Sequence, residues 1–115
     1  MLVRIDPARP EPLHEQIAAQ LRRALGDGRL GTGEQLPPAR QLADALEVNM
    51  HTVLRAYGAL RDEGLVEMRR GRGVTVRAAG GHRARVVELA RDLLAEARRQ
   101  GIGLRDLKAL LEKLS

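Results

Sequence analysis

Apolar residues recur at helical spacing in three stretches of the first half of the chain. Leucine, isoleucine and alanine come about every fourth position over residues 13–25, and similar stripes follow in a short stretch that starts at the proline pair 37–38 and ends at 46, and over 50–63. Proline precedes the first stretch and opens the second, Asn49 precedes the third, and these residues favour helix starts. The pattern predicts three helices, with only the turn Glu47–Asn49 between the second and the third.

The periodicity then changes from that of a helix to that of a strand. Residues 65–68 and 74–76 are short runs rich in apolar residues, and the loop between them consists of arginine and glycine, which predicts a β-hairpin. Beyond a glycine-rich stretch, apolar stripes predict two more helices over 85–100 and 104–114, joined by the tight connection 101–103. The predicted fold class is therefore mainly α with a small β-hairpin (α+β).

The order of these elements indicates how the chain is organised. Two helices joined by a short turn and followed by a hairpin form the layout of a winged helix-turn-helix, in which the second helix of the pair enters the DNA major groove. We therefore expect an N-terminal arm over 1–10, a winged helix-turn-helix DNA-binding domain over 11–78, a linker over 79–84 and a two-helix tail over 85–115, with the helix-turn-helix at about 39–58 and the wing at about 65–77.

Composition excludes several classes of protein. The 115 residues include no cysteine, so disulfides, thiolate metal sites and cysteine nucleophiles are excluded. No apolar run is long enough to span a membrane, and the N-terminus lacks the pattern of a signal peptide, so we expect a cytoplasmic protein that is nucleoid-associated when bound to DNA. The histidines have no ligand spacing and no nucleophile–base pair is evident. We expect no enzyme activity, no metal and no cofactor.

The positive charge is concentrated in one segment. The chain carries a net charge of +5, yet residues 69–85 alone hold six arginines and no acid, so the rest of the chain is close to neutral. Such a segment is either a patch that faces a polyanion or a solvated charged loop, and composition alone does not separate the two. Its position in a hairpin directly after a helix-turn-helix favours DNA, because a wing carries arginine to phosphates or into the minor groove.

The candidate DNA contacts lie at three places in this layout. Arginine at the start of the first helix of the pair lies near the DNA backbone, and short polar side chains at the start of the second helix suit phosphates and base edges. The wing supplies arginines and a glycine that permits close approach. The candidates are Arg40, Asn49, Met50, His51, Thr52, Arg55, Arg69, Arg70, Gly71 and Arg72.

Several of these candidates also have an ordinary structural interpretation. Arg40 fits an exposed surface arginine, and Asn49 fits a helix cap, a role that can coexist with DNA contact. An ion pair of Arg55 with Asp62 or Glu63 is the alternative there, although both acids lie about two helical turns away. Tyr57 shares a face with core positions, so we expect packing, with its hydroxyl in reach of a phosphate.

The tail carries more apolar surface than two short helices can hide from each other. We expect this surface to pair two copies of the chain, since a two-fold dimer that reads two half-sites gains affinity and specificity. The alternative is packing of the tail back on the winged domain. The tail has no aromatic residue, so we expect no small-molecule pocket in it. The predicted dimerisation residues are Val86, Leu89, Leu93, Leu94, Leu104, Leu107, Leu110, Leu111 and Leu114.

Motifs in residues 11–77 resemble the DNA-binding domain of GntR-type bacterial transcription regulators. They are PL-x-x-QI at 12–17, G-x-x-LP-x-x-R-x-LA at 33–43, TV-x-x-AY at 52–57, L-x-x-EGL at 60–65 and R-x-G-x-G-x-x-V at 69–76. The short two-helix tail resembles the YtrA-type branch. The resemblance implies DNA contact by Arg40, no metabolite-binding domain, a tail that pairs two subunits, and repression as the mode of control.

Three positions depart from the pattern of that family. Met50 stands where arginine is usual, which replaces a hydrogen bond to a base by apolar contact, for instance with a thymine methyl group. Glu47 stands where glycine is usual, which costs about 1 kcal/mol if the turn needs a positive φ. His14 replaces a tyrosine, with a consequence only for packing. We expect a homodimeric, sequence-specific regulator, a repressor on a two-half-site operator; a winged-helix protein–protein interaction module is the alternative.

Overall fold

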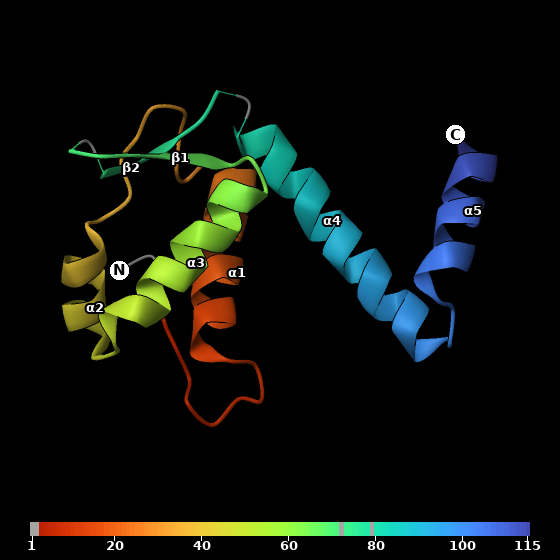
Figure 1. Ribbon diagram of the computed structural model, residues 1–115, viewed down its shortest axis with the longest axis horizontal. Coiled ribbons are helices and arrows are strands. Elements are labelled where there is room, and N and C mark those ends of the chain that lie inside the picture. The colour runs from red at the N-terminus through yellow and green to blue at the C-terminus, as the bar shows by residue number, and fades with distance from the viewer. Residues whose placement is uncertain (1–2, 72, 79) are drawn as a thin grey trace.

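The computed structural model describes residues 3–71, 73–78 and 80–115. In chain order, its elements are α1 (Leu13–Gly26), α2 (Ala39–Leu46), α3 (Met50–Asp62), β1 (Val66–Arg69), β2 (Gly73–Val76), α4 (Gly80–Arg99) and α5 (Leu104–Leu114). The first three helices and the hairpin form one packed unit, from which α4 runs outward and α5 turns back at its far end (Figure 1). The predicted fold class, mainly α with a small hairpin, is confirmed.

The core of the winged domain lies between α1 and α3. The apolar stripe predicted on α1 is buried, and α3 presents Val53, Ala56, Tyr57 and Leu60 to it. The Tyr57 hydroxyl donates to the carbonyl oxygen of Pro37 at 2.5 Å. The core prediction for Tyr57 is confirmed, whereas its predicted reach to a phosphate is wrong, because the hydroxyl is already bound inside the protein.

The wing is an antiparallel hairpin with a partial third strand. Val66 pairs with Val76 at one end of the ladder and Arg69 with Gly73 at the other. The extended segment 34–36, directly before the proline pair Pro37 and Pro38, lies along the free edge of β2, where the Leu36 N–H donates to the Val74 carbonyl and the Val76 N–H donates to the Glu34 carbonyl. This edge pairing ties the wing to the start of α2.

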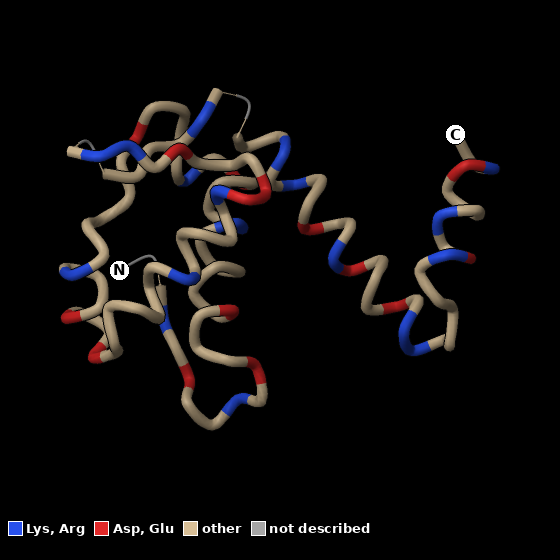
Figure 2. Tube along the Cα trace, in the orientation of Figure 1, with Lys and Arg blue, Asp and Glu red and all other residues tan. Residues whose placement is uncertain are grey.

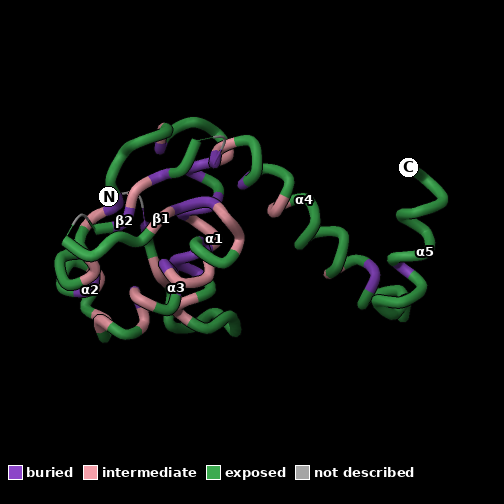
Figure 3. The backbone as a smooth tube through the Cα atoms, turned by 45° about the horizontal axis from the view of Figure 1, so that its top comes forward, coloured by how far each residue is buried: buried purple, intermediate pink, exposed green. Residues whose placement is uncertain are grey.

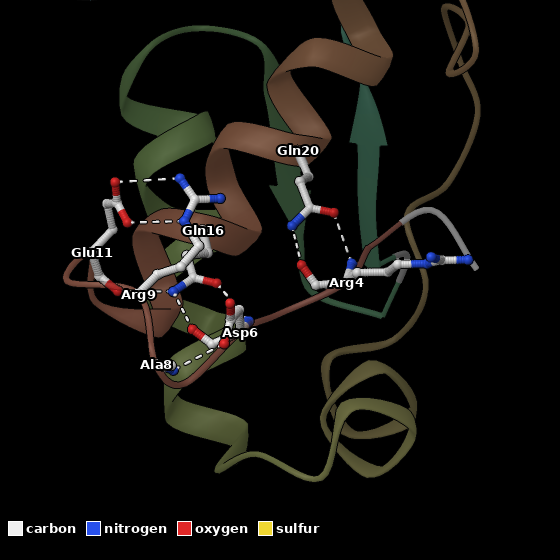
Figure 4. Close-up of polar contacts among 7 residues, drawn as sticks. All are labelled: Arg4, Asp6, Ala8, Arg9, Glu11, Gln16 and Gln20. Carbon is white, nitrogen blue, oxygen red and sulfur yellow. Dashed lines mark hydrogen bonds and ion pairs between the residues drawn. The ribbon is translucent and has the colours of Figure 1, made fainter.

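The N-terminal arm is bound to α1 by two glutamine side chains (Figure 4). The Gln16 amide accepts from the backbone N–H of Asp6 at 2.9 Å and donates to the carbonyls of Asp6 and Glu11. Gln20 binds the backbone N–H and carbonyl of Arg4. These hydrogen bonds hold the arm against α1, and its residue Val3 is part of the buried core. The predicted arm is present, but it is an integral part of the domain.

Helix α4 begins earlier than the sequence predicts. Residues 80–84, predicted as part of a linker, are helical, so that prediction is wrong there, while residue 79 lies outside the described residues. Gly80 and Ala84 are buried. Small residues let the start of α4 lie close against α1 and against the chain that follows α3, and this packing overrides the loop tendency of two consecutive glycines.

Candidate nucleic-acid interface

The short turn that joins α2 to α3 contains a residue with a left-handed backbone conformation. Glu47 adopts a left-handed conformation with φ 57° and ψ 46° at the end of α2. It is the only residue other than glycine with a positive φ in the part of the chain that the structure describes. The conditional prediction that this turn needs a positive φ is confirmed, and glutamate there costs about 1 kcal/mol.

Asn49 caps α3, the second helix of the pair and the one expected to enter the major groove, which is called the recognition helix below. Its side-chain oxygen accepts from the backbone N–H of His51 at 2.8 Å, which confirms the capping interpretation. The first N–H groups of α3 then point out of its N-terminus, where the helix dipole favours a phosphate. The cap therefore fixes the end of α3 that would approach DNA.

The predicted contacts on α2 and α3 differ in exposure. Arg40, His51 and Arg55 are exposed and Thr52 is half-buried. Met50 is also half-buried and packs against the core, so this departure from the family pattern has a role inside the domain. The alternative ion pair of Arg55 is wrong, because its two candidate partners are bound to other arginines.

The turn of the wing presents Arg70 and Gly71. Arg70 is exposed and makes no ion pair with any residue that the structure describes, while Gly71 has a φ of 77° that glycine adopts readily. Arg69 lies 3.4 Å from a carboxylate oxygen of Glu67, so a DNA phosphate would compete with an internal partner for it. Arg72 lies outside the described residues.

These three groups lie on one side of the winged domain. In Figures 1 and 3, α2, the first turn of α3 and the turn of the hairpin are on the side away from α4. A hollow lies between α3 and the wing, with Leu54, Tyr57 and Met68 on its walls and Arg69 and Arg70 among its lining residues. Figure 2 shows basic residues along the hairpin and on α2 and α3, with acidic residues interspersed there as they are on α4 and α5.

His14 is a residue near this face that spacing alone does not reveal. It lines a second hollow together with His51 and Arg55, although it belongs to the start of α1. In the sequence these two histidines are far apart, so no local motif could pair them. No group of three or more potential metal ligands occurs among the residues described.

The tail leaves almost all of its predicted dimerisation residues exposed. Exposure reaches 63% at Val86 and 74% at Leu114, and Leu107 is the exception at 4%. Only the root of α4 packs on the winged domain; beyond it, α4 and α5 stand clear (Figure 3). The alternative in which the tail packs back on the domain is therefore wrong for α5 and for the far half of α4.

Comparison with known proteins agrees with this geometry. The family model described as "Bacterial regulatory proteins, gntR family" matches residues 13–76. The chain belongs to the gntR family. It is therefore a DNA-binding transcriptional regulator, and the relatives that support this assignment are regulators rather than enzymes. No helix among the residues described is long and apolar enough to cross a membrane.

Relatives of the gntR family match different lengths of the chain. The HTH-type transcriptional repressor YtrA of Bacillus subtilis is 30% identical and matches 99% of this chain and 92% of its own. The structure of YtrA from Sulfolobus acidocaldarius superposes with a TM-score of 0.65 at 34% identity, covering 82% of this chain and 99% of that one. An uncharacterized HTH-type regulator of Streptomyces coelicolor is 46% identical over 57% of this chain but only 24% of its own.

A solved complex with DNA shares the fold of the winged domain. The DNA-binding domain of AraR in complex with its operator ORX1 has a TM-score of 0.58 at 22% identity and covers 64% of this chain and 92% of that one. At this identity the likeness concerns the fold alone. The Streptomyces coelicolor regulator, which is much longer, matches only part of this chain, whereas the match to YtrA of Bacillus subtilis extends over 99% of the chain and therefore includes the two-helix tail.

Proposed function

We propose that this chain is a homodimeric repressor that binds an operator of two half-sites, acting in the cytoplasm where chromosomal DNA is accessible. The observation that carries the proposal is the common face of α2, the start of α3 and the wing turn. On that face Arg40, Arg55 and Arg70 have no carboxylate partner among the described residues. Unpaired, exposed guanidinium groups are available to phosphates and guanine edges at no cost of a broken ion pair.

Each group on this face has a distinct proposed role. The start of α3 lies in the major groove, where His51, Thr52 and Arg55 reach base edges or phosphates. Asn49 and Met50 hold the end of that helix in place and border the bases. Arg40 binds the backbone that α2 crosses. In the wing, Arg69 and Arg72 bind phosphates, and Arg70 enters the minor groove beside the close approach permitted by Gly71.

The apolar surface of the tail supports pairing of two copies. Eight of the nine predicted dimerisation residues are among the large hydrophobic residues exposed to solvent. Exposed large apolar residues gathered on two helices in this way are typical of an interface between proteins. A second copy of the same tail covers it by two-fold symmetry, which also places two winged domains for two half-sites. The name of the Bacillus subtilis relative supports repression as the outcome.

The DNA-binding part is tested by selection from a random-sequence duplex library. We expect the full chain to enrich one motif with two-fold symmetry, and affinity for it to fall steeply as salt rises. Arg70→Ala should reduce affinity for the selected motif, because it removes the guanidinium that we place in the minor groove. Arg98→Ala is the matched control, because Arg98 is also exposed and has no carboxylate partner among the described residues, but lies at the far end of α4.

Two results would overturn this proposal. If Arg70→Ala and Arg98→Ala lose the same affinity for the selected duplex, the wing is not part of the DNA interface. Failure to bind any duplex at low salt would contradict DNA recognition and favour the protein–protein interaction module instead.

The dimer is tested separately by sedimentation equilibrium. We expect the wild-type chain to sediment as a dimer and Leu110→Asp to sediment as a monomer. Ser115→Asp introduces the same charge at the end of α5 and should leave the dimer intact. A wild-type monomer at micromolar concentration would contradict the two-half-site arrangement, even if each chain still bound DNA.

A further inference from the structure

Glu63 connects the end of the recognition helix to two other helices. It follows α3 directly, and its carboxylate forms two 2.7 Å bonds with the Arg22 guanidinium of α1. The same carboxylate lies 3.7 Å from Arg91 of α4. Its backbone carbonyl accepts a 2.5 Å hydrogen bond from Arg83, also of α4. One residue therefore fixes the recognition helix relative to both α1 and α4.

The root of α4 is also seated against backbone. A Cβ added to Gly81 would lie 2.9 Å from the carbonyl oxygen of Leu25, at the end of α1. A Cβ added to Gly80 would lie 2.9 Å from the carbonyl oxygen of Leu65, just after α3. Since backbone atoms on both sides approach so closely, α4 leaves the winged domain in one defined direction.

The contacts that α4 makes with Glu63 are not needed to close the core. Arg83 and Arg91 are exposed, whereas, among the residues that the structure describes, α4 contributes Ala84 to the buried apolar core and the partly buried Val87 to its edge. Exposed ion pairs add little to stability. Both arginines bind Glu63, directly after the recognition helix, from two different positions along α4. They therefore hold the axis of α4 in one direction relative to the recognition helix.

The contacts at the root of α4 form a set that we call the α4 joint: Arg22, Leu25, Glu63, Leu65, Gly80, Gly81, Arg83 and Arg91. We propose that the α4 joint sets the separation and rotational phase of the two DNA half-sites, with Glu63 as its positioning residue. The inference rests on the proposed dimer: if the tails pair, the path from one recognition helix to the other runs through two joints. The direction of α4 at each joint then determines where the second recognition helix meets the DNA.

The geometry of α4 makes the half-site spacing sensitive to small changes at the joint. A helix of 20 residues is about 30 Å long at about 1.5 Å per residue. A rotation of about 10° at its root therefore displaces the far end by about 5 Å, compared with a rise of about 3.4 Å per base pair. A modest shift at Gly81 is thus enough to change the preferred spacer by a base pair or more.

The experiment measures the affinity of the full-length protein for duplexes that carry its two selected half-sites with spacers varied one base pair at a time. The main variant is Gly81→Ala, whose new Cβ meets the Leu25 carbonyl. Gly103→Ala is the matched control, because a Cβ there meets nothing within 4 Å. A duplex with a single half-site reports on DNA reading alone, and sedimentation confirms that each variant remains a dimer.

We expect the wild type and Gly103→Ala to share one best spacer, and Gly81→Ala to prefer a spacer that differs by at least one base pair. Its affinity for the single half-site should stay within twofold, which a general loss of stability would not allow. Should Gly81→Ala fail to fold, Arg83→Ala provides the test by flattening the dependence on spacer length. If Gly81→Ala keeps the wild-type best spacer, and Arg83→Ala keeps the wild-type dependence of affinity on spacer length, the inference is overturned. Failure of the wild type to select any duplex would instead overturn the proposed function itself.

Discussion

Replacing Glu63 by glutamine tests how strongly the buried ion pair holds α1 to the end of the recognition helix. The Arg22 side chain is 4% exposed and that of Glu63 is 16% exposed, and both bonds between them are 2.7 Å long. Removing the negative charge leaves a buried guanidinium with no neutralising partner. Breaking one side of such a pair costs about 3–5 kcal/mol, so we expect Glu63→Gln to lose several kcal/mol of the free energy of unfolding.

The measurement is urea unfolding followed by far-ultraviolet circular dichroism, at one fixed protein concentration because a dimer's stability depends on it. The matched control is Arg91→Gln, which removes only the 3.7 Å outer contact of an exposed arginine. Exposed pairs contribute about 0–1 kcal/mol, so this variant should stay close to wild type. Equal losses in the two variants, or a loss below about 1 kcal/mol in Glu63→Gln, would refute the argument that burial makes the inner pair strong.

Three other changes have expected results of their own. Tyr57→Phe should cost about 1 kcal/mol in urea unfolding, because it leaves the Pro37 carbonyl without its donor. Burial raises the pKa of the Tyr57 phenol from 10.0 to about 12. The free energy of unfolding of the wild type should therefore fall between about pH 10 and pH 12. An equally steep fall of the free energy of unfolding of Tyr57→Phe over this range would contradict the argument. Glu47→Gly should raise the melting temperature, by relieving about 1 kcal/mol of strain at φ 57°; an unchanged or lower value would mean the turn is not strained. Asn49→Ala should lower the melting temperature by removing a cap of about 1 kcal/mol, whereas Asn49→Ser should largely preserve it.

The helices and the hairpin could be predicted because each depends on local spacing. Apolar stripes place α1 to α3, and Gly64, just beyond the end of α3, has the positive φ that is common for glycine at that position. The turn at Glu47 could be foreseen only conditionally, since a glutamate does not by itself indicate a left-handed residue. The predicted contacts on α2, α3 and the wing remain predictions, although the fold brings the described ones to one face.

Features that join distant segments could not be predicted in this way. Arg22 and Glu63 are 41 residues apart, and nothing in the spacing around either indicates the other. Gly80 and Gly81 suggest a flexible linker by residue type, yet their lack of side chains allows close helix packing. The binding of the arm by Gln16 and Gln20 likewise depends on tertiary structure, because polar residues on a helix are expected to face solvent.

The single aromatic residue gives this protein an intrinsic optical probe of unusual selectivity. Tyr57 is the only tyrosine, and the chain contains no tryptophan or phenylalanine. It is buried between α3 and the segment that leads into α2, with its hydroxyl on Pro37. Tyrosine fluorescence and near-ultraviolet dichroism of the unlabelled protein therefore report on the helix-turn-helix alone. Separation of the tails would be silent in these signals, and opening of the DNA-reading unit would not.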